Sequence, residues 1–411
     1  MHTIDPVITE WLSMTVRWLH VTAAMVWVGS SFYFTQTDMR LRPGDGLPVG
    51  ALGEAWQVHG GNFWHMVRYK VAPERMPKTF TWYLWESRIT WLSGFALLVL
   101  VYYMQADLFL IDKSVMDLSP LEAGLFSLIS LVVIWLIYDR LCKSPLGEHD
   151  VALAAVVYIL LVVLSYAFTR VLSGRAAINQ IGAVVGTLMV ANAFFVIHPT
   201  QRKSVASLLA GKAPEAVAVA KARQRSIHNN YLTLPVILLM LSNHYPLLYA
   251  TRYNWIIAAI VLALGPVIRH FFNTRDAGRG SPWWTWLVVA IGMIAIAFLS
   301  SLGAKADGLT PVTKEPAVLL KGSDVKTNGL DAAAEEIVST RCSMCHAREP
   351  SWDQMIFPGG GVLLETPADI LARKRQIAIV AVLSSAMPPG NITEMSAEER
   401  STLAAWMAAS H

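Results

Sequence analysis

Long apolar runs separated by short polar connections occupy the first three quarters of the chain. A bilayer core about 30 Å thick needs about 20 apolar residues per helix, and about eight segments meet this requirement. The predicted spans are 11–34, 82–104, 121–141, 151–171, 177–197, 231–248, 253–272 and 283–302. Aromatic residues gather near many of their ends, as they do at membrane interfaces. The pattern predicts an all-α fold that begins with a polytopic transmembrane bundle of about eight helices.

The pattern changes after Leu302, where the chain turns polar and charged residues follow one another closely. We therefore expect a transmembrane domain over 1–302, a linker over 303–330 and a small polar domain over 331–411. With 54% hydrophobic and 15% charged residues, the composition is too apolar for an ordinary soluble enzyme. The first span follows acidic residues instead of a basic segment, so we expect it to be retained and not cleaved as a signal peptide.

The charged connections indicate an orientation. The connections after the first, third, fifth and seventh spans hold most of the Lys and Arg, whereas the others hold Lys113, Arg175 and Arg252. By the positive-inside rule, the first set is cytoplasmic. Both termini and the C-terminal domain are then expected in the periplasm of a bacterial inner membrane. The net charge of +4 is explained by these loops, so no nucleic-acid partner is expected.

The segment Cys342-Ser343-Met344-Cys345-His346 is typical of covalent haem attachment. Its two thiols form thioethers with the haem vinyl groups, and His346 supplies an axial nitrogen. A redox disulfide or half of a zinc site are the alternatives, but no second Cys-x-x-Cys follows. Met387, followed by Pro-Pro-Gly, lies where a small cytochrome needs its sixth ligand, and Met395 is a rival. The motif predicts one c-type haem with His346 and Met387 on its iron.

The surroundings of the motif predict two helices. Residues 330–340 are expected to form a helix leading into it, and Ser396 is expected to cap a last helix through Trp406 in the S-x-x-E pattern. Two helices packed over a haem form a small class I cytochrome c domain. Haem is attached in the outer compartment, where the loop charges independently place this domain. The third cysteine, Cys142, is interpreted as a buried structural thiol.

His20 lies inside the first predicted span, about 14 Å below Trp11 and near mid-bilayer. Ionisable residues at this depth are usually functional. Two interpretations stay open: an axial ligand of a non-covalent b-type haem, with His244 as the second ligand, or a histidine bonded to a neighbouring helix. The spacing from His20 to Trp27 and Gly29 resembles the first helix of several small haem-binding membrane families.

Polar residues also cluster on the predicted cytoplasmic side. Taken singly, each suits an interfacial or capping position, but together they predict the walls of a polar pocket. They are His59, Gly60, Gly61, His65, Glu86, Arg88, Asn192, His198, His228, Asn229 and Asn230.

Several of these segments carry a family resemblance. The chain resembles, over almost its whole length, the bacterial membrane-bound urate oxidases (urate hydroxylases) that end in a cytochrome c domain. Arg88 departs from the family pattern, in which we expect a neutral residue after the glutamate. The segments that carry the resemblance are 18–20 with Trp27 and Gly29, 59–61 with His65, 85–86, 91–95, 186–192, 228–235 and 242–246.

The resemblance implies oxidation of urate to 5-hydroxyisourate, a step of purine degradation, with water as the oxygen source. The electrons pass through the c-type haem to a soluble cytochrome c or a terminal oxidase of the respiratory chain. A flat purine anion calls for an aromatic face, amide groups, a cationic or donor group, and a proton acceptor. Residues of these types are Trp82, Trp85, Arg88, Asn229 and Asn230 for binding, and Glu86, His65 and His228 for proton removal.

A cytoplasmic urate pocket and an outer cytochrome would be separated by most of a ~30 Å hydrocarbon layer. A b-type haem on His20 would then relay the electrons, whereas a urate site on the outer face requires no relay. The alternative function is a membrane quinol oxidase that reduces its own cytochrome c. A transporter would leave the cytochrome without a role, and a haem–copper oxidase would need adjacent metal ligands that the scattered histidines do not provide.

Overall fold

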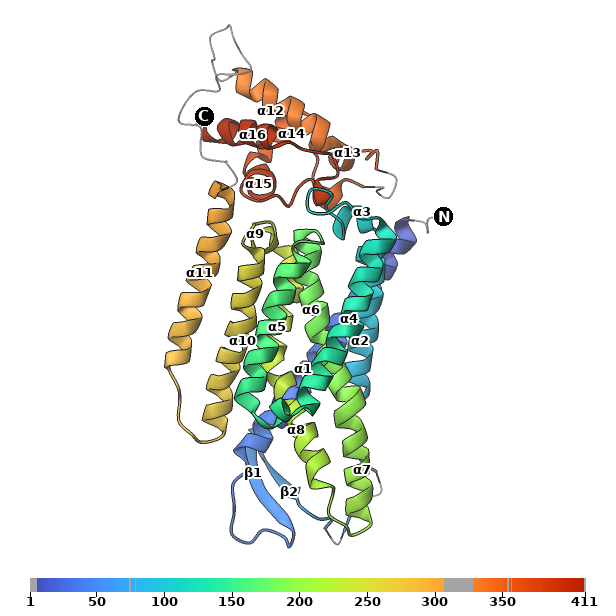
Figure 1. Ribbon diagram of the computed structural model, residues 1–411, viewed down its shortest axis with the longest axis vertical. Coiled ribbons are helices and arrows are strands. Elements are labelled where there is room, and N and C mark those ends of the chain that lie inside the picture. The colour runs from blue at the N-terminus through green and yellow to red at the C-terminus, as the bar shows by residue number, and fades with distance from the viewer. Residues whose placement is uncertain are drawn as a thin grey trace.

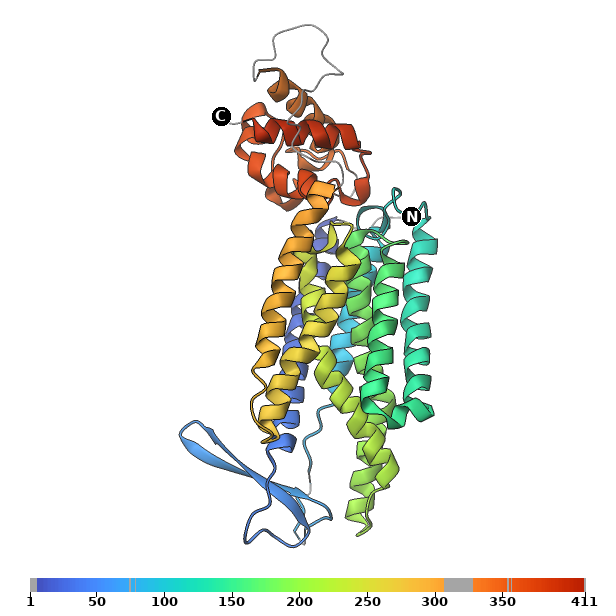
Figure 2. The same cartoon turned by 60° about the vertical axis from the view of Figure 1, so that its left-hand side comes forward.

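The structure is a computed structural model that describes residues 6–73, 75–77, 79–306, 328–352, 355 and 357–409. The molecule is elongated, with a bundle of long helices in the middle and a small helical domain on one end (Figures 1 and 2). The first helix, α1, begins at the end that carries the small domain. A β-hairpin and helix α7 project from the opposite end. We refer to these ends of the bundle as the domain end and the hairpin end.

Each of the predicted spans overlaps a helix of the bundle, although the span 231–248 runs past the end of α8 into two short helices. The bundle contains α1 (Pro6–Arg40), α2 (Trp85–Leu97) with η1 (Leu98–Tyr103), α4 (Pro120–Lys143), α5 (Asp150–Phe168), α6 (Gly174–Ala191) with η3 (Asn192–Ile197) and α7 (His198–Leu209), α8 (Ala216–Leu241), α10 (Asn254–Asp276) and α11 (Trp284–Ala306). Short helices join them at the ends: α3 (Ala106–Phe109), η2 (Pro145–Glu148), η4 (Ser242–His244) and α9 (Pro246–Tyr249).

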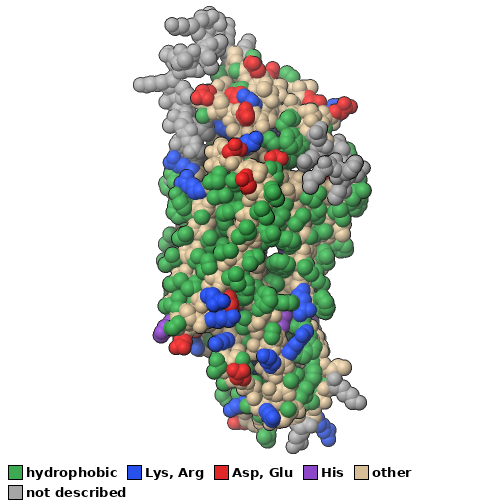
Figure 3. All heavy atoms as spheres, turned by 45° about the vertical axis from the view of Figure 1, so that its right-hand side comes forward, with side chains coloured by type: hydrophobic (Ala, Val, Ile, Leu, Met, Phe, Trp, Pro, Cys, Tyr) green, Lys and Arg blue, Asp and Glu red, His purple; other side chains and the backbone are tan. Residues whose placement is uncertain are grey.

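Five of the described helices are long and apolar enough to cross a membrane, which is consistent with a membrane protein. They are Pro120–Lys143, Asp150–Phe168, Gly174–Leu209, Asn254–Asp276 and Trp284–Ser301. Hydrophobic side chains cover the middle of the face in Figure 3, and Lys and Arg gather toward the hairpin end. Large side chains such as Trp11 and Trp18 are 62% and 75% exposed on α1, which suits a surface that faces lipid.

Local sequence signals explain where these helices begin and how closely they pack. Ser119 caps α4 by accepting from the backbone N–H of Glu122, whose carboxylate in turn accepts from the N–H of Ser119. Pro235 inside α8 lies against Gly265 of α10, where a Cβ would clash with the proline ring. The glycine therefore permits the close approach of the two helices.

A β-hairpin departs from the predicted all-α fold. Strands β1 (Ala51–His59) and β2 (Asn62–Tyr69) pair in antiparallel fashion around Gly60 and Gly61. Both glycines have positive φ, 62° and 77°, which two-residue hairpin turns require. The sequence prediction does not include this hairpin, because 59–65 falls in the polar connection between the predicted spans 11–34 and 82–104.

The C-terminal domain contains the two predicted helices, α12 (Asn328–Arg341) and α16 (Ala397–Ala408), which pack against each other. Trp406 Nε1 donates to Asp331 Oδ1 at 2.7 Å, and Ser396 forms the predicted capping box with Glu399. The core includes Val338 and Leu403, both fully buried. The remaining elements are α13 (Ser343–His346), η5 (Gly359–Gly361), α14 (Pro367–Ala372), α15 (Lys374–Ile377), η6 (Ala378–Val382) and η7 (Pro389–Asn391).

The predicted linker over 303–330 falls mostly on residues 307–327, which lie outside the described residues. The small domain nevertheless contacts the bundle directly through its loop 385–390. Ser385 donates from its backbone N–H to the carbonyl of Ala250 at 3.3 Å. Gly390, at φ +55°, lies so close to Ile111 that a Cβ would be 2.6 Å from its carbonyl oxygen. This loop, which carries Met387, is therefore the part of the domain that rests on α3 and α9.

Candidate functional site

The Cys-x-x-Cys-His segment lies where α12 ends and α13 begins. Both thiols are free, and burial raises the pKa of the Cys342 thiol to about 11, so it is uncharged at neutral pH. The Nδ1 atom of His346 lies 3.1 Å from the carbonyl oxygen of Val362. When Nδ1–H donates to that carbonyl, Nε2 keeps its lone pair for a metal. Two free thiols beside such an imidazole fit a covalently attached haem.

The two candidate methionines have different surroundings. Met395 is 3% exposed and belongs to the hydrophobic core of the small domain. Met387 is half-buried in the loop 385–390, and its backbone is held at both ends. Its N–H donates to the carbonyl of Val380 at 2.9 Å, and its own carbonyl accepts from Arg400 Nη1 at 3.0 Å. Met395 is thus used for packing, whereas Met387 is held in a fixed loop.

His20 is hydrogen-bonded to the neighbouring helix α2. Its Nδ1 atom lies 2.8 Å from the carbonyl oxygen of Thr90 and 3.2 Å from Ser93 Oγ. The ring packs against Gly94, where a Cβ would be 2.8 Å from His20 Cε1. These contacts fit the second interpretation of His20. A bond through Nδ1 also leaves Nε2 available for a metal, as the first interpretation requires.

The structure does not bring His20 and His244 together. His20 lies at the level of Gly94, whereas the residue before His244, Asn243, accepts a hydrogen bond from Tyr102 at 2.6 Å. Gly94 and Tyr102 are about 12 Å apart along the helix axis, and the His244 side chain is exposed. A b-type haem on His20 stays a prediction, for which acid extraction of non-covalent haem is the test.

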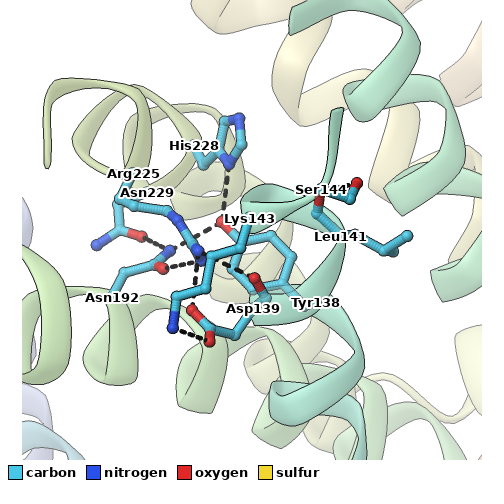
Figure 4. A network of polar contacts seen from close by, with 9 residues as sticks. All are labelled: Tyr138, Asp139, Leu141, Lys143, Ser144, Asn192, Arg225, His228 and Asn229. Carbon is cyan, nitrogen blue, oxygen red and sulfur yellow. Dashed lines mark hydrogen bonds and ion pairs between the residues drawn. The ribbon is translucent and has the colours of Figure 1, made fainter. Parts of the chain in front are cut away.

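A network of polar contacts joins α4, η3 and α8 near the hairpin end (Figure 4). At its centre Arg225, which is 3% exposed, donates from Nη2 to Asp139 Oδ1 and from Nη1 to Asn192 Oδ1, both at 2.9 Å. The second oxygen of Asp139 binds Lys143 Nζ at 2.6 Å. A buried arginine is thereby neutralised and hydrogen-bonded inside the bundle.

The same network fixes two predicted site residues, His228 and Asn229. Asn192 Nδ2 donates to Asn229 Oδ1 at 2.9 Å and to the Tyr138 hydroxyl at 3.0 Å. Because that hydroxyl accepts from Asn192, its own proton is left for His228 Nδ1 at 2.7 Å. Asn229 Nδ2 donates to the carbonyl of Met189 at 2.8 Å. The amide of Asn229 is therefore bonded at both ends within the protein.

Asn230 points into a second polar group, although it is adjacent to Asn229 in sequence. Its Oδ1 accepts from Asn273 Nδ2 at 2.9 Å and from Arg269 Nε at 3.3 Å. Arg269 also lies over the ring of Phe32, 4.1 Å from the ring centroid. The structure thus directs Asn229 and Asn230 toward different partners.

Other predicted residues lie near the start of α2. The Arg88 guanidinium lies 5.3 Å from the ring centroids of both Trp85 and Phe194. Trp82 and Trp85 are exposed. Among the described residues, Glu86 Oε2, Arg88 Nε, His198 Nδ1 and Asn230 Nδ2 are buried without a hydrogen-bond partner. Such atoms call for a ligand or water.

His65 lies outside the bundle, in strand β2. Its Nε2 atom is 2.6 Å from Glu54 Oε2, and its ring stacks on Trp56 with the centroids 4.1 Å apart. The structure does not bring it into contact with Glu86 or His228.

Four partners of the predicted residues were not predicted from the sequence: Tyr138, Asp139, Arg225 and Arg269. A signal was available, because Asp139 and Arg269 are charged residues within long apolar helices. Ionisable residues at such positions usually pair with one another or line a functional site.

The chain was compared with protein families, curated proteins and solved structures. It matches the family model described as Urate oxidase N-terminal over residues 6–300. No curated protein and no solved structure was found to match. The match begins with α1 and ends within α11, so it covers nearly the whole helical bundle and more than half of the chain. The chain therefore belongs to the urate oxidase N-terminal family.

Proposed function

We propose that this protein is a membrane-bound urate oxidase that hydroxylates urate with water and passes the electrons to its own c-type haem. The observation that carries the proposal is the docking of the Cys-x-x-Cys-His domain, through the Met387 loop, onto a bundle of the urate oxidase N-terminal family. A bundle that oxidises urate needs an electron acceptor, and this domain would provide one in the same chain.

Cys342, Cys345, His346 and Met387 would hold the haem. The free thiols, the His346–Val362 hydrogen bond and the fixed Met387 loop support this assignment. When bound, the haem accepts electrons one at a time. The chain's own residues bind the substrate, exclude competing reactions and move protons.

The proposed reaction is balanced without oxygen. Urate and one water molecule give 5-hydroxyisourate, two protons and two electrons, so no hydrogen peroxide is formed. The electrons leave in two single transfers, and a soluble cytochrome c or a terminal oxidase takes them onward. The bundle offers two places for a purine anion: the unpartnered atoms around Glu86 and Arg88, and a cavity at the domain end.

We further propose that the bundle crosses a bacterial inner membrane about eight times, in contact with lipid, with both termini and the small domain in the periplasm. The gathering of Lys and Arg toward the hairpin end supports this orientation (Figure 3). The hairpin would then lie in the cytoplasm.

Reduction of the purified protein distinguishes urate from a quinol as the electron donor. Under anaerobic conditions, urate is expected to reduce the c-type haem, with two haems reduced per urate consumed. The absorbance of the reduced haem is the measurement, and a short-chain quinol is the comparison. Reduction by the quinol and not by urate would favour the alternative function, quinol oxidation, and contradict the proposal.

A further inference from the structure

A cavity of about 290 Å³ lies between the domain end of the bundle and the Met387 loop. Its walls come from α3, the segment after α5, the start of α6, the segment after α9 and the loop 385–390. Sites for small molecules often lie between domains, and this volume is near the lower end of their range of roughly 300–1,000 Å³. The cavity therefore suits a compact ligand.

Three arginines line this cavity: Arg170, Arg175 and Arg252. In the connections and helix ends on this side of the bundle, the other cations are Lys113 and Lys305. Cations are uncommon on this side, yet most of them gather at one cavity. In the part of the chain that the structure describes, none of the three arginines forms an ion pair with a carboxylate. A site for an anion needs guanidinium groups that no carboxylate neutralises.

Arg175 has the surroundings of a binding residue. Its guanidinium lies 4.6 Å from the centroid of the Phe109 ring, and its Nε atom is buried without a hydrogen-bond partner among the described residues. Arg170 and Arg252 lie over the rings of Tyr166 and Tyr253, at 4.9 and 4.8 Å. A buried N–H without a partner is costly unless a ligand or water satisfies it.

The other walls fit a flat heteroaromatic molecule. Phe109, Tyr249 and Trp255 supply aromatic surface, and Asn254 supplies an amide. Among the described residues, Asp112 is the one carboxylate in the wall, so three guanidinium groups leave the cavity positive. An aromatic wall with a net positive charge matches a purine anion better than it matches a neutral quinol with an apolar tail.

We propose that this cavity is the urate site, with Arg175 as the main anion-binding residue and Arg252 as a second contact. The inference rests on the proposed function and adds the location of the urate site. Met387 itself lines the cavity, so substrate and the proposed haem ligand share one compartment. No electron then has to cross the hydrocarbon layer, and the relay through His20 is unnecessary.

Binding of urate to the pre-reduced protein tests this location without turnover. Equilibrium dialysis of urate against the full-length protein, kept reduced and anaerobic, gives the dissociation constant. Replacing Arg175 by Gln is expected to weaken binding about tenfold to a hundredfold, the effect of losing a hydrogen bond to a charged group. Arg252→Gln, at an exposed position where the fold is not at risk, is expected to weaken binding in the same direction.

Lys113→Gln is the matched control, because Lys113 carries the same charge at the same end but does not line the cavity. It should keep the affinity of the unmodified protein.

Unchanged urate affinity in both arginine variants would overturn the location. A shifted haem reduction potential with unchanged urate affinity in the arginine variants would also overturn the location. The arginines would then bind the carboxylates of the haem. Weaker binding in Arg88→Gln with normal binding in Arg175→Gln would place urate at the hairpin end. In each of these cases urate still reduces the unmodified protein, whereas failure of the proposed function abolishes that reduction.

Discussion

Replacing Met387 by alanine is expected to leave the haem covalently attached while lowering its reduction potential by on the order of 0.1 V or more. The thioether sulfur favours reduced iron, and axial ligands set haem potentials over a range of about 0.8 V. Covalent attachment depends on Cys342 and Cys345, which the substitution does not alter. A redox titration followed by the absorption spectrum measures both effects.

Met395→Leu is the control, because it keeps the volume of a buried core side chain and removes the other candidate sulfur. Its spectrum and potential should match those of the unmodified protein. A normal spectrum in Met387→Ala together with a changed one in Met395→Leu would move the axial ligand to Met395.

Replacing Asp139 by alanine is expected to destabilise the bundle by about 3–5 kcal/mol, the cost of leaving a buried charge without its partner. The charge is that of Arg225, which is 3% exposed and, within the described part of the chain, keeps Asn192 as its remaining side-chain hydrogen-bond partner. Thermal or denaturant-induced unfolding in detergent, followed by circular dichroism, measures the loss.

Lys143→Ala is the matched control, since it removes the other ion pair of the same carboxylate. The Lys143 side chain is 59% exposed, and exposed pairs contribute about 0–1 kcal/mol. Equal losses in the two variants would contradict a special role for the buried arginine. A small loss in Asp139→Ala would show that Asn192 and water satisfy Arg225 without the aspartate.

Much of the fold could be predicted, because the relevant signals are local. Length and apolarity mark the helices of the bundle, and the S-x-x-E pattern at Ser396 marks the start of the last helix. A local signal for the hairpin was also present, in the turn residues Gly60 and Gly61, but no strands were predicted on either side of them. Some helix ends differ from the predicted spans by a few residues, as at α2, which begins at Trp85, whereas α8 begins at Ala216, well before the predicted span 231–248.

The arrangement of the polar residues could not be predicted, because it depends on contacts between distant segments. Asp139 and Arg225 are 86 residues apart, and no spacing rule relates them. The sequence also predicts neither the direction of Asn229 and Asn230 nor the docking of Gly390 on Ile111. The cavity at the domain end is lined by residues of both domains, so neither domain forms it alone.

The source of the added oxygen tests the central claim most directly. Turnover of urate in water labelled with heavy oxygen, without air and with an added one-electron oxidant, is followed by mass spectrometry of the product. We predict that 5-hydroxyisourate carries the label from water, and carries it equally when the reaction is run in air. A product whose added oxygen comes from molecular oxygen would contradict the account, because electrons would then pass to oxygen and the c-type haem would have no role in the reaction.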